Sequence, residues 1–326
     1  MKVIGLGGGI GASRLWTTLL QHDRRLDLSV VVNTAEDLWI HGLRVCPDLD
    51  TVMYALSGRQ DTARGWGVRD ETWQCMGVLG ELAGDQWFNL GDRDLGVHLF
   101  RTGRLRAGRR LSEITADLAQ TFEVGCRVIP ATEAEVTTRV VTPQHRDLHY
   151  QEFLVREHAS VDVLRSYVDG IGDAEPTDGL LDDIAAADLV IIGPSNPIAS
   201  VRPMLLLPGM REALAATRQR TVVVTPTVEA VPIEDPGEAG RARSRARLLQ
   251  AAGFEPTPVG IARFYADVAG VYVLDRADET LAPAIEALGL RVILADTLVH
   301  RGADPAALVD AVCGVANGRV GSASAG

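Results

Sequence analysis

Four carboxylates stand close together in an otherwise apolar stretch near the start of the chain, NTAEDLWIHGLRVCPDLDT at residues 33–51. They are Glu36, Asp37, Asp48 and Asp50. Carboxylate oxygens are the ligands that Mg²⁺ prefers, and a protein-bound Mg²⁺ usually holds a substrate phosphate as well. Asp48 and Asp50 could instead cap a helix that begins near Thr51. We expect two or more of the acids to bind Mg²⁺ or to provide a base.

A glycine cluster precedes these acids in MKVIGLGGGIGASRL. Its members are Gly7, Gly8, Gly9 and Gly11, followed by Ala12. The spacing G-x-G-x-x-A is typical of a turn that cradles a phosphate, although such a turn also serves helix packing alone. No G-K-[ST] follows, so the turn is not a P-loop. Asn33 stands where an NAD site usually has an acid, which disfavours a conventional dehydrogenase.

A second acid and base cluster occupies WFNLGDRDLGVHL at residues 87–99. Arg93 could clamp a phosphate or carboxylate, with Asp92 fixing its orientation. The alternative is helix capping with a surface ion pair. His98 is more simply a structural histidine than a catalytic one, and we expect the same of His145 and His149 on one face of a strand.

A third polar stretch, IIGPSNPIAS at residues 191–200, directly follows a buried apolar run. Its two prolines make a rigid loop that presents Ser195 and Asn196. A polar loop at the end of a buried strand suits a phosphate or a ribose, although it can also be a plain turn. We expect these two side chains to contact a nucleotide.

The elements that must position these residues follow an α/β pattern. Short, β-branched apolar runs predict strands buried on both faces of a parallel sheet. They lie at Val3–Leu6, Asp27–Asn33, Ala187–Gly193, Thr221–Thr225, Val271–Leu274 and Arg291–Leu294. Helical stretches such as 203–216 and 241–252 separate them. The pattern predicts a Rossmann-like doubly wound, mostly parallel sheet, whose ligands bind at the carboxyl ends of its strands.

The middle of the chain departs from this pattern. Residues 72–82 and 111–122 have helical periodicity, and residues 126–157 alternate more like antiparallel strands. Because the parallel-strand pattern resumes afterwards, we expect one Rossmann-like domain over residues 1–326. Residues 70–180 form an approximate inserted helical plus β subdomain within it.

The composition is that of an acidic globular protein. Its 326 residues include 43 acidic and 32 basic side chains, for a formal net charge of −11. This balance disfavours a nucleic-acid partner, whose affinity would come from a basic stripe. The four cysteines form no C-x-x-C pair, so no zinc cluster or disulfide framework is indicated. No apolar run approaches the ~20 residues of a membrane helix. We expect a cytoplasmic protein without a membrane partner.

Taken together, the three stretches resemble the CofD-type phospholactate transferases of deazaflavin coenzyme F420 biosynthesis, called FbiA in actinobacteria. The matching blocks are GGGIGASRL, NTAEDLWIHGLRVCPDLDTVMYALSG, GWGVRDETW, LGDRDLGVHLFRTGRLRAG, HYQEFLVR, IIGPSNPIASVRPMLLLPGMREAL and ADTL. They run from residue 1 to about residue 300. The order PDLDT, LGDRD, GPSNP is highly specific.

The resemblance implies a Mg²⁺-dependent transfer. A guanosine-diphosphate-activated small acid (2-phospholactate, phosphoenolpyruvate or 3-phosphoglycerate) gives its phosphoester group to the ribityl hydroxyl of the deazaflavin FO, and GMP leaves. Such a reaction depends mainly on positioning and charge neutralisation. The alternative is a nucleotide-sugar-binding regulator of the same superfamily without transferase activity.

The resemblance also implies roles for individual residues. Asp50 should lie near the FO hydroxyl, as a metal ligand or a base, with help from Asp37 or Asp48 in holding Mg²⁺. Asn89 stands where some members have a lysine that touches FO. The guanosine diphosphate portion should contact the turn Gly7–Ala12, together with Ser195 and Asn196.

Two further expectations concern segments outside these blocks. After TVVVT the chain reads TPTVEAVPIEDPGEAG, where the family usually has a pair of small residues and a G-P-A segment. The added acids Glu229, Glu234 and Asp235 would oppose an anionic donor unless they point outward or contact the base. The apolar run MLLLPGM at 204–210 is compatible with a homodimer if it is exposed.

Overall fold

The chain folds around a seven-stranded parallel sheet with the strand order β12-β11-β10-β9-β1-β2-β5. The computed structural model describes residues 1–23, 25–84 and 86–316. The sheet consists of β1 (Lys2–Leu6), β2 (Asp27–Val32), β5 (Arg127–Pro130), β9 (Leu189–Ile192), β10 (Thr221–Val224), β11 (Val271–Asp275) and β12 (Arg291–Ala295). The predicted Rossmann-like doubly wound fold is confirmed. β5 pairs with β2, although it lies inside the segment that the sequence predicts to be an insertion.

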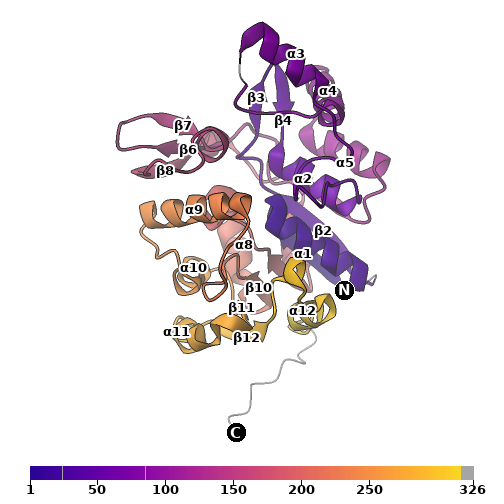
Figure 1. Cartoon of the computed structure of the whole chain (residues 1–326). Coiled ribbons are helices and arrows are strands. Elements are labelled where there is room, and N and C mark those ends of the chain that lie inside the picture. The colour runs from indigo at the N-terminus through magenta and orange to yellow at the C-terminus, as the bar shows by residue number, and fades with distance from the viewer. Residues whose placement is uncertain (24, 85, 317–326) are drawn as a thin grey trace.

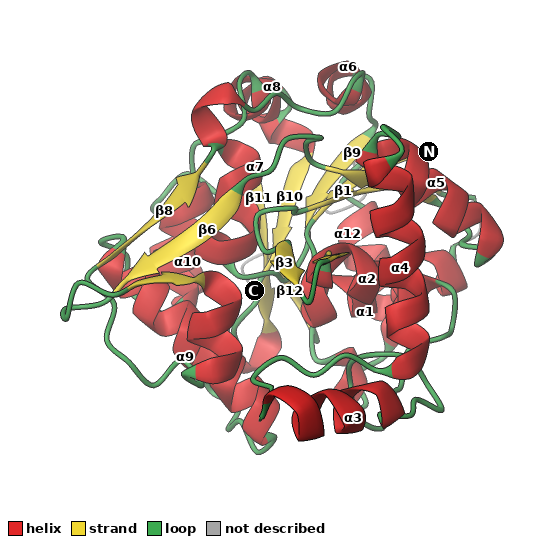
Figure 2. Cartoon of the chain, turned by 90° about the horizontal axis from the view of Figure 1, so that it is seen from above, coloured by secondary structure: helices red, strands yellow, loops and turns green. Residues whose placement is uncertain are grey.

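Helices cover both faces of this sheet (Figures 1 and 2). Successive strand residues point to opposite faces, so Val223 packs into one core while Val222 and Val224 pack into the other. One face carries α1 (Gly9–His22), α2 (Pro47–Leu56), α5 (Leu111–Thr121) and α12 (Pro305–Cys313). The other carries α6 (Leu180–Ala185), α7 (Arg202–Leu205), α8 (Met210–Ala216), α9 (Pro236–Ala251), α10 (Pro258–Tyr265) and α11 (Ala282–Glu286).

The strand order reverses between β1 and β9. From β1 the chain builds β2 and β5 on one side, and it later builds β9 to β12 on the other. The loops that leave β1 and β9 therefore diverge at their carboxyl ends and open a crevice, which is where doubly wound folds bind ligands. The glycine cluster follows β1, and the loop of Ser195 and Asn196 follows β9.

Two smaller units surround this end of the sheet (Figure 1). The hairpin β3 (Leu38–Ile40) and β4 (Leu43–Val45) packs with α3 (Gln74–Ala83) and α4 (Asp92–Arg106) around a small core of its own. The strands β6 (Thr137–Val141), β7 (Asp147–His149) and β8 (Arg165–Asp169) form a separate antiparallel sheet. We call the first unit, residues 38–45 and 74–106, the cap.

Several local predictions are wrong. The predicted strand over LHYQEFLVR ends at His149, where the chain enters the π-helical turn η1 (Glu152–Arg156). His145 lies in the turn before β7 with a φ of 59°, so it does not share a strand face with His149. The predicted helix 203–216 is broken into α7 and α8 at Gly209, whose φ is 76°.

The run at 204–210 belongs to the core. Met204, Leu205, Leu207 and Met210 are each at most 3% exposed. Within the run only Leu206, at 42%, and Pro208 are exposed. The expectation of a homodimer therefore loses the exposed apolar surface on which it rested.

Candidate active site

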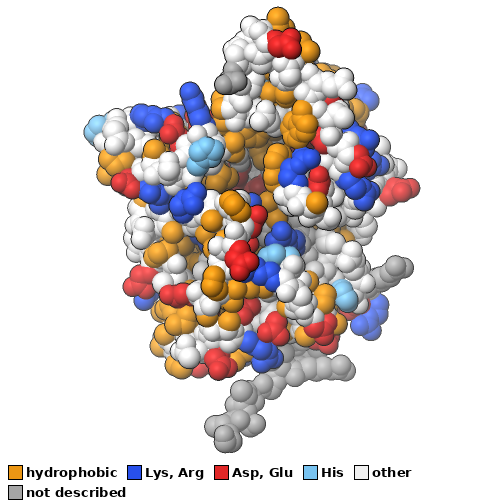
Figure 3. Space-filling model, in the orientation of Figure 1, with side chains coloured by type: hydrophobic (Ala, Val, Ile, Leu, Met, Phe, Trp, Pro, Cys, Tyr) orange, Lys and Arg blue, Asp and Glu red, His pale blue; other side chains and the backbone are white. Residues whose placement is uncertain are grey.

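A cavity of about 730 Å³ opens at the carboxyl ends of β1, β9 and β10. Figure 3 shows the molecule hollowed between the cap and the body that contains the sheet. Of the predicted site residues, seven line this cavity: Gly8, Gly9, Gly11, Asp48, Asn89, Ser195 and Asn196. Its size lies in the range of small-molecule sites.

The glycine turn is held against two of these side chains. A Cβ atom on Gly8 would lie 2.5 Å from the carboxyl carbon of Asp48, and one on Gly7 would lie 2.6 Å from Ser195 Oγ. Ser195 Oγ also donates a hydrogen bond to the Gly8 carbonyl, at 3.0 Å. The missing side chains therefore let Asp48 approach the amino terminus of α1. Gly7 and Ala12 lie beneath the turn and do not line the cavity.

Asp48 occupies the first turn of α2 and is 4% exposed. Its Oδ2 accepts a hydrogen bond of 3.0 Å from Asn33 Nδ2. Burial raises the pKa of Asp48 to about 7, although the Asn33 amide opposes this shift. Asn33 is itself fully buried and does not line the cavity. It positions Asp48 from behind the cavity wall.

Glu36 is a second buried acid at the cavity wall. Its carboxylate accepts hydrogen bonds from Gln151 Nε2 at 2.9 Å and from Ser200 Oγ at 2.8 Å. Burial, followed by the negative charge of Asp48, raises the pKa of Glu36 well above its usual value. No basic side chain forms an ion pair with either acid in the described part of the chain. Their shared charge is therefore uncompensated, which is the electrostatic setting for a bound cation.

Asp37 points away from this cavity into the cap. Arg44 Nη2 lies 3.4 Å from its Oδ2, and the His149 ring lies 3.1 Å from its carbonyl oxygen. Burial raises the pKa of Asp37 to about 6, against the attraction of Arg44. With Arg44 as its partner, Asp37 links β4 to β7 and is not placed to hold a metal in the cavity.

Asp50 also lies outside the cavity lining. Arg101 of α4 binds both of its carboxylate oxygens, and His98 Nδ1 lies 3.6 Å from Oδ2. Asp50, Asp94 and His98 are the one set of three potential ligands within 4.8 Å of one another among the described residues. The Arg101 guanidinium pairs with Asp50 and so offsets one of the two carboxylate charges of this cluster. The cluster therefore joins α2 to α4, and the predicted set Asp37, Asp48 and Asp50 does not converge on one ion.

The LGDRD block is structural in the main. Asp92 accepts hydrogen bonds from Gln74 N and Cys75 N, both at 3.0 Å, and thus joins the starts of α3 and α4. Arg93 is exposed and donates to the Arg69 carbonyl, at 3.3 Å. Neither Asp92 nor Arg93 lines the cavity, so the structure does not bring Arg93 together with the glycine turn and Ser195.

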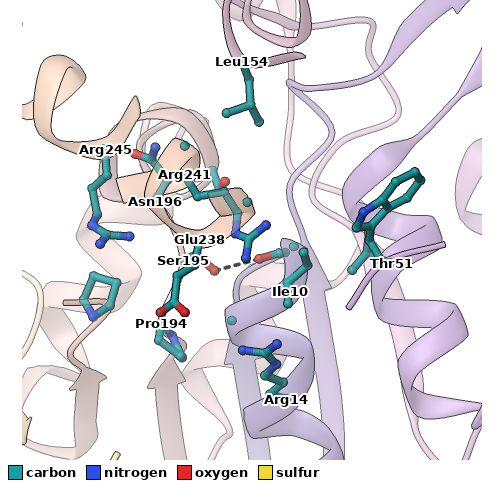
Figure 4. A pocket seen from close by; sticks show the side chains of 18 of the residues that line it. Ile10, Arg14, Thr51, Leu154, Pro194, Ser195, Asn196, Glu238, Arg241 and Arg245 are labelled. Atoms are coloured by element: carbon teal, nitrogen blue, oxygen red, sulfur yellow. Dashed lines mark hydrogen bonds between the residues drawn. The ribbon is translucent and has the colours of Figure 1, made fainter. Parts of the chain in front are cut away.

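The cations of the cavity come instead from α1 and α9. Figure 4 shows Arg14 extending from α1, and Arg241 and Arg245 from α9, with Ser195 between them. Burial lowers the pKa of Arg14 and Arg241, and it lowers that of Arg245 to about 10. Sequence reasoning missed this cluster. The signal was RARSRAR at 241–247, which puts Arg241 and Arg245 one helical turn apart in an acidic chain.

A tyrosine connects these arginines to the loop after β9. Asn196 Oδ1 accepts from the backbone of Ile198 and Ala199 and so caps the π-helix η3 (Pro197–Val201). Its Nδ2 lies 3.5 Å from Tyr150 Oη, which in turn lies 3.0 Å from Ser244 Oγ of α9. The loop is thus rigid on the side that faces the arginines.

The opposite end of the cavity is aromatic. Trp66, Trp87 and Phe88 line it beside Asn89, and the Trp87 and Phe88 rings meet edge to face with their centroids 5.3 Å apart. Such surfaces suit a planar ring system. The cavity therefore has a cationic end, an aromatic end and three acids, of which Glu238 pairs with Arg301 while Glu36 and Asp48 have no basic partner among the described residues.

Residues 3–269 match the family described as 2-phospho-L-lactate transferase CofD. The chain belongs to the CofD family. A phosphoenolpyruvate transferase of Kitasatospora aureofaciens is 38% identical over 296 residues, covering 89% of this chain and 90% of that protein. A 2-phospho-L-lactate transferase of Methanosarcina acetivorans is 37% identical over 297 residues, covering 91% and 93%. The resemblance drawn from the motifs is confirmed.

A solved structure shares the fold of this CofD-family chain. It is a member of the UPF0052 family from Bacillus halodurans, with a TM-score of 0.60, 17% sequence identity and coverage of 96% of this chain and 98% of that one. At this identity the likeness concerns the fold alone. Among the described residues, none of the helices is both long and apolar enough to cross a membrane.

The segment where this chain departs from the usual CofD pattern contributes one acid, Glu238, to the cavity lining, and Arg301 Nη2 lies 3.1 Å from its Oε2. The three acids singled out from the sequence lie elsewhere. Glu229, Glu234 and Asp235 are exposed and do not line the cavity. Asp235 caps α9 by accepting from the Glu238 backbone N–H at 2.6 Å. The segment is anchored by Asp278, which accepts from the backbone N–H of Glu229 at 2.7 Å. These acids therefore do not stand against an anionic substrate.

Proposed function

We propose that this chain transfers a phosphoester group from a guanosine-diphosphate-activated small acid to the ribityl hydroxyl of the deazaflavin FO, with release of GMP. The small acid is 2-phospholactate, phosphoenolpyruvate or 3-phosphoglycerate. Membership of the CofD family and the names of its relatives support a transferase of this kind. The step forms coenzyme F420-0 or its dehydro form.

One observation carries the proposal: two uncompensated carboxylates and three arginines face the same cavity. A nucleotide diphosphate ester is bound through both kinds of group: the carboxylates hold a metal ion, and the arginines bind the phosphate oxygens. Arginines bind phosphate oxygens with several donors each, and Arg14, Arg241 and Arg245 surround the place where a phosphate can approach the amino terminus of α1.

Glu36 and Asp48 fit a bound Mg²⁺. They are buried, lack a basic partner among the described residues, and hold their protons more tightly than ordinary carboxylates. A Mg²⁺ ion, when bound, would offset the negative charge that develops on the transferred phosphoryl group. Asn33, Gln151 and Ser200 hold the two carboxylates in place through the hydrogen bonds described above.

The acceptor is assigned to the aromatic end of the cavity. Trp66, Trp87 and Phe88 offer flat surfaces for the deazaflavin rings, and Asn89 supplies a neutral amide for a ring or ribityl oxygen. The ribityl chain would then extend toward Asp48. GMP is a good leaving group, so alignment of the hydroxyl with phosphorus is the main task of the site.

The test is a mass-spectrometric assay with FO, MgCl₂ and each of the three guanosine-diphosphate-activated donors. We expect a coenzyme F420-0-type product with one donor. Asp48→Asn, Glu36→Gln and Arg241→Gln should each lower the rate at least about a hundredfold, the scale for one lost electrostatic contact to a transition state.

Glu229→Gln is the matched control, because it removes an acid of the segment that lies outside the cavity. It should retain the wild-type rate. If the folded wild type yields no product with any donor, the proposed transfer is wrong. Titration with FO and with UDP-sugars then tells a regulator from a transferase, since a regulator predicts no binding of FO.

A further inference from the structure

A second pocket, of about 570 Å³, lies behind the loop that carries Ser195 and Asn196. Its walls come from β8, η3, α7, α8, the end of α9 and α10, and Figure 1 shows β8, α9 and α10 on the same side of the molecule. Four arginines and one acid line it: Arg165, Arg202, Arg211, Arg263 and Asp267. The pocket is therefore a cationic site in a chain whose net charge is −11.

Two of the four arginines lack an acidic partner. Arg211 pairs with Asp267, and Arg263 Nη1 lies 3.9 Å from Glu255. Within the described part of the chain, no carboxylate lies within 4.0 Å of the guanidinium groups of Arg165 or Arg202. The positive charge of the pocket is thus only half neutralised by the protein itself.

Arg202 is the more constrained of these two. It is half-buried, and burial lowers its pKa. Its guanidinium donates to the Ser166 carbonyl over a long 3.5 Å. The hydroxyl of Ser166, in the same pocket, is buried and has no hydrogen-bond partner. A buried charge without a counter-ion and a buried hydroxyl without a partner both cost free energy unless a ligand satisfies them.

We propose that this pocket binds a small phosphate-bearing anion. Ser166 approaches from β8 and Arg202 from α7, so their donors reach an anion from different directions, and the exposed Arg165 adds positive charge at the rim. That arrangement suits the several oxygens of a tetrahedral phosphate better than a planar carboxylate, which one guanidinium can bind alone. Phe254 and Phe264 form the apolar part of the wall and strengthen the attraction by excluding water.

The pocket shares a structural element with the active-site cavity. Ser195, Asn196 and Ser200 line the cavity, whereas Ile198 and Arg202 of the same turn line the second pocket. Ser200 also donates to Glu36. An anion bound to Arg202 would therefore stabilise the turn η3 on the side opposite the active-site cavity. The site is independent of the proposed transfer, because it uses none of the residues assigned to that reaction.

The test is calorimetric titration of the full chain with inorganic phosphate. We expect the wild type to show a binding event that Arg202→Gln weakens at least about tenfold, the loss for one charged hydrogen bond. Arg241→Gln removes phosphate binding in the other cavity and should leave this event unchanged. Arg276→Gln, an exposed arginine that lines neither pocket, is the matched control.

The proposal is overturned if Arg202→Gln, in the Arg241→Gln background, binds phosphate as tightly as Arg241→Gln alone. Circular dichroism checks that each variant is folded. If Arg202→Gln does not fold, Ser166→Ala and Arg165→Gln decide instead, because the first removes a hydroxyl donor and the second a positive charge from the lining of the pocket. Unchanged phosphate affinity in both of these variants would also overturn it.

Discussion

Asp48 is buried and also lines the cavity. Its protonation therefore controls whether the cavity can hold a cation. A bound Mg²⁺ needs the ionised form, and the pKa of Asp48 is about 7. Below that pH the proton competes with the metal. We predict that Mg²⁺ affinity falls at least about tenfold from pH 8 to pH 6, since a ligand with this pKa is mostly protonated at pH 6.

Calorimetric titration with MgCl₂ at both pH values measures this change. Asp48→Asn should abolish the binding, and Glu229→Gln is the comparison variant because Glu229 is exposed and lies outside the cavity. Equal Mg²⁺ affinity at pH 6 and pH 8 would contradict the assignment of Asp48 as a ligand.

The same carboxylate makes the stability of the metal-free protein depend on pH. Its pKa is raised on folding, from 3.8 to about 7, so the folded state binds more protons than the unfolded state between these values. The free energy of unfolding therefore falls as pH rises through that range. Asp48→Asn has no charge to bury, and at pH 8 without Mg²⁺ it should melt at least about 3 °C above the wild type.

Thermal melts at pH 5 and pH 8 test this. The difference in melting temperature between Asp48→Asn and the wild type should be smaller at pH 5, where Asp48 is largely protonated. Saturating Mg²⁺ should stabilise only the wild type. A variant that melts below the wild type at pH 8 would show that the Asn33 contact matters more than the buried charge.

Residue spacing could have told Asp48 and Asp50 apart. Two positions on a helix are separated by about 200° of rotation, so side chains at 48 and 50 must face opposite ways once PDLDT forms the first turn of α2. The acids were recognisable from the sequence as a group. Which one lines the cavity depends on where α4 packs, and Arg101 is 51 positions from its partner Asp50.

At the scale of elements, the Asp50–Arg101 ion pair holds α2 against α4. Both side chains are buried, so removing one partner leaves a buried charge uncompensated, at a cost of about 3–5 kcal/mol. We predict that Arg101→Met and Asp50→Asn each destabilise the protein by about that amount. The double variant should be more stable than the sum of the two losses predicts.

Urea unfolding of the four proteins forms the double-mutant cycle. His98 and Asp94 remain as neighbours in every variant, so the coupling measured is that of the pair within its network. Losses that simply add would mean that the two side chains stabilise the helices independently, against the arrangement described here.

Asp235 stabilises a helix and does not take part in the cavity. Its carboxylate caps α9, the helix that carries Arg241 and Arg245. Asp235→Ala should cost about 1 kcal/mol of stability, and Asp235→Asn, which keeps an acceptor, should cost less. Neither should change KM for the donor, because Asp235 does not line the cavity. A lower KM on removing the charge would show that it repels the substrate.

The strands were predictable because β-branched runs buried on both faces leave a clear local signal. The secondary-structure predictions failed where tertiary contacts determine the local conformation. Residues 150–156 alternate in polarity like a strand but form η1, because Phe153 is buried in the main core while the chain turns there. The role of α9 could not be predicted either, because its arginines reach the cavity only when α9 packs near α1 and the loop after β9.

At the scale of the whole molecule, segments from the first and the last helix of the described chain meet at the cavity. The glycine turn of residues 7–12 leads into α1, and α12 packs on that helix through Leu308, Val309 and Val312, each at most 5% exposed. Leu308 also lines the cavity. The family match ends at residue 269, yet the fold continues past it through β11, β12 and α12.

This arrangement predicts the effect of ending the chain after Gly302, which removes α12. Burial of the three apolar side chains contributes about 1.5–3 kcal/mol each, against a total of about 5–15 kcal/mol for a typical domain. The shortened chain should therefore melt more than about 10 °C below the full chain, followed by circular dichroism. Ala307→Ser, at an exposed position of α12, should melt like the wild type. A shortened chain with an unchanged melting temperature would mean that α1 and the glycine turn hold their places without α12, and that the cavity is built by residues 1–302 alone.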